Sequence, residues 1–418
     1  MDQKTTTTEV SNEKMSKLIV ANSLSYRIPP ALSLYNTRQY IEYPSQNSVY
    51  KAGQTIIVQL SNSDVFVDGR NSYLRFKLRC DAPLDAGEKV STGDYNSTCA
   101  MFSRVRYIHS SGQEICHNVN LGEYRVVDDH ASESHDFWRN TAKMMGYRSL
   151  DDEKDLELPG GDEPAHSFAI PLHKVVSMFN SYDNKLTPPM LLSGSRIEIQ
   201  LASKEAAFNT TGQNAIGYEI SEVICSLDSY ILSDSAFSVL EKMSAQGLVE
   251  YCFEDYEVIQ RTTGVDRVNI EFTKSIGRAT SAIVSVRDTN VLSSFAEDHG
   301  KPLPEESGVE THQFRLNSLY MPAKEADSLQ NYMNFLQYNK DAGNYTIADQ
   351  EAAQLVVQTL QRSDFLGPSS GLPINSSSAL RYDARFTGAV GGDRVVSLYI
   401  KHLKIVSPYL YDRVVISV

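Results

Sequence analysis

Three short segments alternate between apolar residues and charged or polar ones, and this alternation limits the fold more than any other feature of the chain. The segments are Tyr73–Arg79, Arg196–Leu201 and Arg267–Phe272. From Leu74 to Arg79, each Leu or Phe is followed by an Arg or a Lys. A strand places successive side chains on opposite faces, so it separates these two sets as no helix would. The sequence therefore predicts β-strands with one buried face.

Other segments carry weaker strand patterns, and helical patterns are sparse. Further strands are expected at residues 54–60, 101–108, 113–118, 167–172, 219–231, 249–260, 280–287, 311–320, 380–387 and 395–406. Helices are expected at residues 122–145, 234–243, 324–338 and 347–361. In the last of these, Ala352, Leu355, Val356 and Leu360 follow a helical spacing.

The order of these elements is similar in the two halves of the chain. Each half has strands with one helical excursion, although no residue-level repeat connects them. We therefore expect an all-β protein with a few helices, made of two tandem eight-stranded antiparallel jelly rolls. The expected divisions are a flexible N-terminal arm at 1–35, a first jelly roll at 36–232, a linker helix at 233–248 and a second jelly roll at 249–418.

The linker helix carries an apolar stripe. Phe237, Leu240 and Met243 lie at helical spacing after Asp234, and Gly247 ends the pattern. We expect this stripe to pack between the two sandwiches and to hold them as one rigid unit.

The charge of the chain argues against direct packaging of nucleic acid. The net charge is -13, and a protein that coats nucleic acid needs clustered Lys and Arg. In residues 1–30, four basic residues and three acidic ones leave only +1. The Thr-rich start of the chain is too polar to order itself, which is why residues 1–35 are expected to form an arm.

The cysteines and the N-terminus indicate folding inside a cell. The five cysteines are odd in number and show no CxxC or Cys/His spacing, which argues against a zinc site. The N-terminus has no secretory apolar region, and no apolar run is long enough to span a bilayer. We expect reduced thiols and a protein that is not secreted.

One acidic and histidine-rich cluster lies in the expected helix 122–145. It consists of Asp128, Asp129, His130, Glu133 and His135. The two histidines are five residues apart, whereas helical metal sites favour three or four. A solvated helix face is therefore favoured over a metal site. The chain also has no nucleophile elbow and no phosphate-binding loop, so we expect no catalytic residues, no metal and no cofactor.

A series of short motifs resembles one protein family. The residues that carry the resemblance are Ile170, Pro171, Leu172, Phe179, Leu186, Pro188, Pro189, Ile197 and Ile199, followed by the linker helix. Their order resembles the closing strands of the first domain in double jelly-roll major capsid proteins of double-stranded DNA viruses. At the start of the linker helix, Ser235 and Ala236 depart from the acidic and arginine pair of the giant-virus members. The resemblance therefore favours polinton-like viruses, adintoviruses and virophages.

This resemblance implies a structural protein of the virion and not an enzyme. It implies a homotrimer that forms a pseudo-hexagonal capsomer and tiles an icosahedral capsid next to neighbouring trimers. The implied partners also include penton and minor capsid proteins, and the arm can contact an internal membrane. The alternative is a viral spike, a vertex protein or a carbohydrate-binding β-sandwich module. A β-sandwich glycosidase, which needs two carboxylates in a cleft, is a weaker option.

Overall fold

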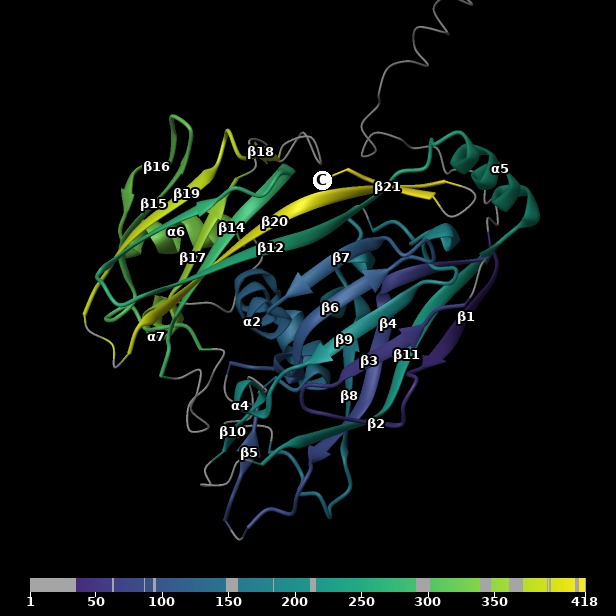
Figure 1. The fold of residues 1–418 in the computed structure, drawn as a ribbon, viewed down its shortest axis with the longest axis horizontal. Coiled ribbons are helices and arrows are strands. Elements are labelled where there is room, and N and C mark those ends of the chain that lie inside the picture. The colour runs from purple at the N-terminus through teal and green to yellow at the C-terminus, as the bar shows by residue number, and fades with distance from the viewer. Residues whose placement is uncertain are drawn as a thin grey trace, which may run out of the picture. The chain divides into compact units, whose positions relative to one another are not determined.

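The computed structural model describes most of the chain after its first 34 residues. The described residues are 35–61, 64–85, 87–92, 95–147, 157–182, 184–210, 216–290, 301–338, 347–360, 371–388, 390, 392–409 and 413–417. They belong to one compact unit that starts at Tyr35 (Figure 1). The expected arm at 1–35 lies outside the described residues except for Tyr35, so its flexibility stays a prediction.

Two antiparallel sheets form the first sandwich. One sheet contains β1 (Tyr35–Pro44), β11 (Tyr218–Leu232), β4 (Val65–Cys80) and β8 (His166–Pro171) in that spatial order, and β2 (Val49–Lys51) pairs with β11. The other contains β3 (Thr55–Gln59), β9 (Arg196–Leu201), β6 (Phe102–Ile108) and β7 (Glu114–Val119). Two short strands, β5 (Val90–Ser91) and β10 (Asn209–Thr210), pair separately.

The second sandwich also consists of two antiparallel sheets. Its first sheet contains β12 (Tyr251–Thr263), β20 (Arg394–Tyr409), β14 (Ile276–Asp288) and β17 (Leu355–Thr359), with β18 (Leu372–Ile374) on β14 and β21 (Arg413–Ser417) on β20. Its second sheet contains β13 (Arg267–Phe272), β19 (Leu380–Phe386), β15 (Val309–Leu316) and β16 (Leu319–Ala326).

The two sandwiches have the same topology. When the eight main strands of each are counted along the chain, one sheet has the order 1-8-3-6 and the other the order 2-7-4-5. This antiparallel arrangement, in which the first and last strands are neighbours, is that of a jelly roll. The expected fold class of two tandem jelly rolls is therefore confirmed, although no residue-level repeat connects the halves.

The described helices are α2 (Leu121–Ser132), α3 (Leu172–Val175), α4 (Lys204–Ala207), α5 (Asp234–Ala245), α6 (Ser328–Tyr338) and α7 (Ile347–Ala352). Three of them occupy matching places in the two halves. Helix α2 lies between the fifth and sixth main strands of the first sandwich, and α6 and α7 lie between the same two strands of the second. Helix α5 follows β11 and precedes β12, in the place expected for the linker.

Some expected elements differ from those observed. The helix expected at 347–361 ends at Ala352, and residues 355–359 form strand β17 instead. This strand is buried on both faces, and a short apolar run of that kind has no periodicity that separates it from a helix. The strand expected at 311–320 is a hairpin that turns at Asn317, whose φ is 54°.

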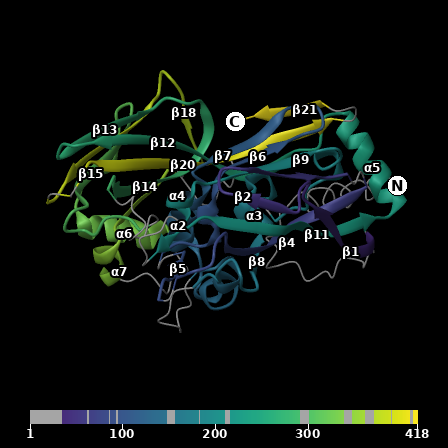
Figure 2. The same ribbon diagram turned by 60° about the horizontal axis from the view of Figure 1, so that its bottom comes forward.

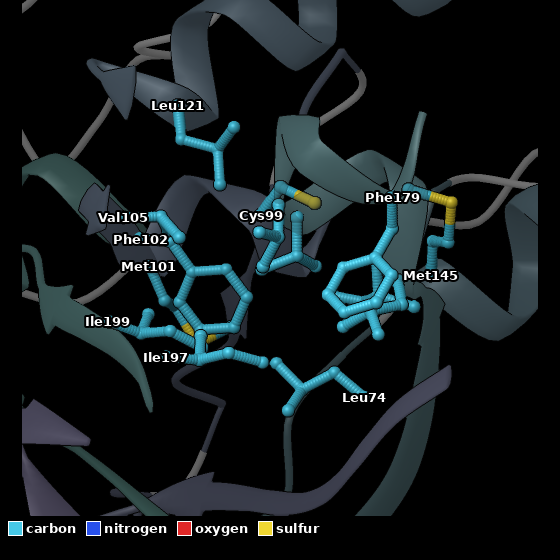
Figure 3. Close-up of a cluster of buried hydrophobic side chains, with 14 of the residues drawn as sticks. Leu74, Cys99, Met101, Phe102, Val105, Leu121, Met145, Phe179, Ile197 and Ile199 are labelled. Carbon is cyan, nitrogen blue, oxygen red and sulfur yellow. The ribbon is translucent and has the colours of Figure 1, made fainter. Parts of the chain in front are cut away.

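The core of the first sandwich contains the apolar residues of its alternating strands (Figure 3). Leu74 of β4, Ile197 and Ile199 of β9, and Phe102 of β6 point toward one another in it. Each of these side chains is almost completely buried. Because β9 pairs with both β3 and β6, a one-residue slip would turn its isoleucines away from the core.

The central strands β14 and β20 of the first sheet of the second sandwich are buried on both faces. Val396, Leu398 and Ile400 of β20 pack into the core of the second sandwich. The intervening Tyr399 packs into the apolar core that contains the first sandwich. This sheet therefore packs against the apolar cores of both sandwiches and is a shared sheet.

Candidate functional site: the interface between the sandwiches

Helix α2 belongs to the first sandwich but lies against the shared sheet of the second. It contacts β14 and β17, and also α6, the helix that has the matching place in the second sandwich. Nine of its twelve residues are buried, including Arg125, Asp128 and Asp129. A helix with buried charged residues requires ionic partners, because unpaired charges are costly to remove from water.

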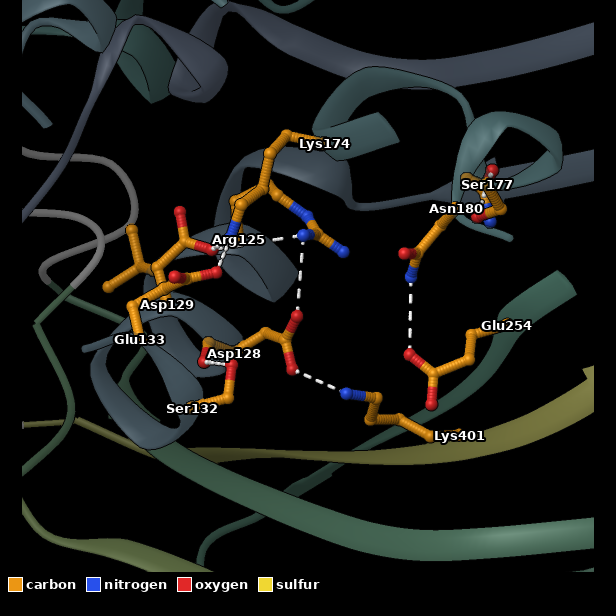
Figure 4. A network of polar contacts seen from close by, with 12 residues as sticks. Arg125, Asp128, Asp129, Ser132, Glu133, Lys174, Ser177, Asn180, Glu254 and Lys401 are labelled. Carbon is orange, nitrogen blue, oxygen red and sulfur yellow. Dashed lines mark hydrogen bonds and ion pairs between the residues drawn. The ribbon is translucent and has the colours of Figure 1, made fainter. Parts of the chain in front are cut away.

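Those partners come from both sandwiches (Figure 4). Lys401 lies on β20 of the second sandwich, and its ammonium nitrogen is 3.0 Å from Oδ1 of Asp128. The ammonium of Lys174, on α3 of the first sandwich, lies 2.6 Å from Oδ1 of Asp129 and also pairs with Glu133. Arg125 pairs with both aspartates, at 3.3 and 3.8 Å. The network thus contains three cationic and three anionic side chains.

A second ion pair joins the start of α2 to the shared sheet. Arg287 of β14 lies 2.6 Å from Glu123 of α2, and both side chains are less than a tenth exposed. Gln260 of β12 donates a hydrogen bond of 3.1 Å to the same carboxylate. The pair lies beside a cavity of about 300 Å³. The Arg287–Glu123 pair and the Gln260 hydrogen bond hold α2 against β14 and β12 of the second sandwich.

Other contacts continue along β12. Asn118 of β7 donates a hydrogen bond of 2.7 Å to Asp255 of β12. The rings of Tyr124 and Tyr256 are stacked, with centroids 3.6 Å apart. The Tyr256 hydroxyl also donates to the backbone carbonyl of Val119. The sandwiches are therefore connected by ionic, aromatic and backbone contacts.

The charges of the network stabilise one another. Burial alone would raise the pKa of Asp128, but Lys401 and Arg125 outweigh burial and hold that pKa at about 2. Burial alone would lower the pKa of Lys174, but Asp129 and Glu133 outweigh it and raise that pKa. Asp128 is consequently a carboxylate and Lys174 an ammonium at neutral pH.

This arrangement suits a mechanical role and not acid–base chemistry. Every cation of the network already has an anionic partner. Because the amine of Lys174 stays protonated, Lys174 does not act as a nucleophile. Across the described ranges, no group of three or more His, Cys, Asp or Glu side chains is placed to hold a metal ion. In the same ranges, no helix combines the length and the apolar character needed to cross a bilayer.

The predicted solvated helix face at Asp128, Asp129 and His130 is wrong. Asp129 is completely buried, and His130 stacks on Tyr95 and contacts Trp138. Lys174 and Tyr147 of the first sandwich cover Asp129, and Lys401 of the second sandwich covers Asp128. The sequence pattern of the helix reveals neither contact. Glu133 is half-buried on Lys174, and only His135 is exposed.

The residues of the family-like motif lie in or beside the core of the first sandwich. Ile170, Leu172, Phe179, Ile197 and Ile199 are each at most 1% exposed. Pro171, Pro188 and Pro189 are buried, and Leu186 is half-buried. They position strands and turns and bring no reactive group together.

The predicted docking of the linker helix between the sandwiches is not what the structure has. Phe237 and Leu240 are half-buried, and Met243 is 40% exposed. The Ser244 hydroxyl donates to the backbone carbonyl of Pro408 on β20, which fixes one side of α5. Helix α2 joins the sandwiches instead, because its buried side chains contact the shared sheet.

Sequence reasoning missed the cations that complete the interface. Lys174 lies beside apolar residues in α3, and Arg287 and Lys401 lie inside the largely buried strands β14 and β20. A charged residue inside a strand that is buried on both faces is a usable signal, because such a residue requires a buried partner. The sequence did not show which carboxylates those partners are.

Two jelly rolls of identical topology, arranged in tandem in one chain, define the double jelly-roll fold. Solved structures of viral capsid proteins have this fold. A structure of the PBCV-1 virus capsid matches with a TM-score of 0.64 and 14% identity, over 94% of this chain and 98% of that one. The Faustovirus major capsid protein matches with a TM-score of 0.57 and 7% identity, over 91% and 92% of the two chains.

The major capsid protein of mavirus also matches, with a TM-score of 0.55 and 8% identity, over 96% of this chain and 94% of that one. No family model matches the sequence, and no curated protein matches it significantly. At these identities the likeness shows the fold. The resemblance drawn from the sequence motifs is thus confirmed in its architecture.

Proposed function

We propose that this protein is the major capsid protein of a double-stranded DNA virus. In this proposal it trimerises into pseudo-hexagonal capsomers that tile the shell of the virion, and it is made inside the host cell. The observation that carries the proposal is the identical strand order of the two sandwiches. The likeness to capsid proteins over more than nine-tenths of the chain supports it.

The tandem arrangement has a geometric use. Three copies around a three-fold axis present six similar sandwiches, and a hexagonal outline tiles a flat facet. Such a unit must keep its two sandwiches in fixed relation, or the outline would vary from copy to copy. The shared sheet and the buried network around Asp128 supply that rigidity.

The alternative of a spike, vertex or carbohydrate-binding module has less support. Binding modules in tandem usually move on a linker, with a small and polar contact between them. Here one apolar core contains residues of both sandwiches, such as Phe179 and Tyr399. The proposed partners are further copies of this chain, and then penton and minor capsid proteins. Membrane contact by the arm stays a prediction.

Electron microscopy of the purified protein tests this proposal. Averaged top views should show six lobes with three-fold symmetry. Two-lobed particles that remain single at high concentration would favour a binding module. A second experiment is expression in quantity, after which closed shells or flat hexagonal sheets are expected.

A further inference from the structure

Helix α6 exposes three of its apolar side chains. Leu329, Met333 and Leu336 are 66%, 48% and 43% exposed. They are four and three residues apart, so they share one face of the helix. The opposite side carries Asn331 and Asn334, which are buried, and Asn331 donates a hydrogen bond of 2.8 Å to the carbonyl of Leu355. Phe335 is also on the buried side and is 0% exposed. Helix α6 therefore carries apolar residues on both faces, whereas a surface helix usually keeps them on the side that meets the core.

The composition of α6 limits what can cover this stripe. No residue from Ser328 to Tyr338 is charged. Helices that lie on membranes carry Lys or Arg on their polar face, and phosphate backbones also require cations. An exposed apolar patch without such charges is typical of a protein contact. The surface that covers it is therefore expected to be apolar.

The chain has such a surface on α5. Val239, Met243 and Leu248 are 56%, 40% and 60% exposed. Val239 and Met243 are one turn apart, and Gly247, with φ of 69°, closes the helix so that the amide of Leu248 donates to the carbonyl of Met243. This closure places Leu248 next to Met243. The three residues form one apolar patch.

The two patches lie in different parts of the described unit. Helix α6 belongs to the second sandwich, and α5 lies beyond the first, at the other end of the described unit (Figures 1 and 2). We propose that the α6 stripe of one copy packs on the α5 patch of the next copy, a head-to-tail contact. This inference rests on the proposed function, because it assigns the contact that joins copies within the trimer.

A head-to-tail contact accounts for both patches. A symmetric contact between two α6 helices would bury that stripe but leave Val239, Met243 and Leu248 in water. Head-to-tail contacts cover both patches at once, and they repeat until the ring closes. A closed ring covers both patches of every copy, and the proposed capsomer sets the number of copies at three.

Cysteine cross-linking tests the pairing. All five native cysteines are buried, so an introduced surface cysteine is the preferred target of a short bismaleimide. The variants are Met333→Cys on α6, Met243→Cys on α5 and the double variant. Denaturing gels should show no cross-link for either single variant alone and a dimer band when the two are coexpressed. The double variant should give bands up to three linked chains.

Each other result overturns the inference. A dimer band from Met333→Cys alone would mean that α6 pairs with itself. A trimeric mass in solution without any cross-link would mean that other faces join the copies, and the proposed function would stand. A monomeric mass would remove both.

A charge on either patch gives an independent measurement. Met333→Glu and Met243→Glu should each weaken trimerisation by at least tenfold in dissociation constant, and their thermal stability as single chains should be unchanged. Val265→Glu is the control, since Val265 is 62% exposed in the turn between β12 and β13 and belongs to neither patch. An equal loss of trimer in all three variants would contradict the assignment.

Discussion

The ammonium of Lys401 on β20 lies 3.0 Å from the carboxylate of Asp128 on α2, and this buried pair joins the second sandwich to the first. Arg125 completes the neutralisation of Asp128 from its other oxygen, at 3.3 Å. The pair is also close to Tyr338, whose hydroxyl lies 3.2 Å from Lys401. Loss of Lys401 therefore leaves Asp128 buried with Arg125 as its only cation among the described contacts, and loss of Asp128 leaves the ammonium of Lys401 buried without its anionic partner.

We expect Lys401→Met to lower the free energy of unfolding by about 3–5 kcal/mol, because Asp128 keeps only part of its compensation. Asp128→Asn should cost a similar amount. The double variant should cost less than the sum of the two, since it removes both charges. Urea unfolding of the three variants measures these values.

The control is Lys274→Met, whose partner Glu257 lies on the surface, and it should cost less than about 1 kcal/mol. Additive losses would show that the pair does not interact.

Acid should destabilise the second sandwich through a histidine in its core. His312 is 2% exposed and packs beside Phe314 and Tyr382. Burial lowers its pKa from 6.5 to about 4. The unfolded chain therefore binds the proton first as the pH falls. The stability that the neutral ring confers is complete above pH 6.5 and declines as the pH falls toward 4.

The variant His312→Phe should flatten this part of the pH profile. Denaturant midpoints between pH 7 and pH 4.5 measure it. His166→Phe is the matched control, because His166 is exposed on β8, and it should leave the slope as it is in the parent protein. A parent protein whose stability does not change over this range would contradict the role of His312.

The motif residues and the linker helix should differ in their importance for stability. Phe179 is 1% exposed in the first core, so Phe179→Ala should cost about 3–5 kcal/mol. Leu240 is only half-buried on α5, and Leu240→Ala should cost less than about 2 kcal/mol. Thermal or urea unfolding ranks the two variants. A larger loss for Leu240→Ala would mean that α5, and not α2, holds the sandwiches together.

The strands were predictable wherever one face is buried and the other is wet. Arg196–Leu201 and Arg267–Phe272 were both predicted from alternation and form β9 and β13. Strand β17 was mistaken for part of a helix because both of its faces are buried. The matching topology of the halves could be inferred from the order of elements, since that order needs no similarity of residues.

The interface was not predictable in the same way. The pattern of α2 suggested that Asp128 and Asp129 face water, because nothing local distinguishes a buried carboxylate from a solvated one. Their partners are distant in sequence: Lys401 lies 273 residues from Asp128. Long-range pairing of this kind depends on how the two sandwiches meet, and a single sequence does not encode that in any local signal.

The mass of the purified protein in solution tests the capsid account most directly. One chain has a mass of 46.6 kDa. Light scattering coupled to size exclusion should give about three times this value at submicromolar concentration, because an obligate capsomer contact buries on the order of 2,000 Å² or more. A particle of 46.6 kDa that stays monomeric as its concentration rises would contradict the account.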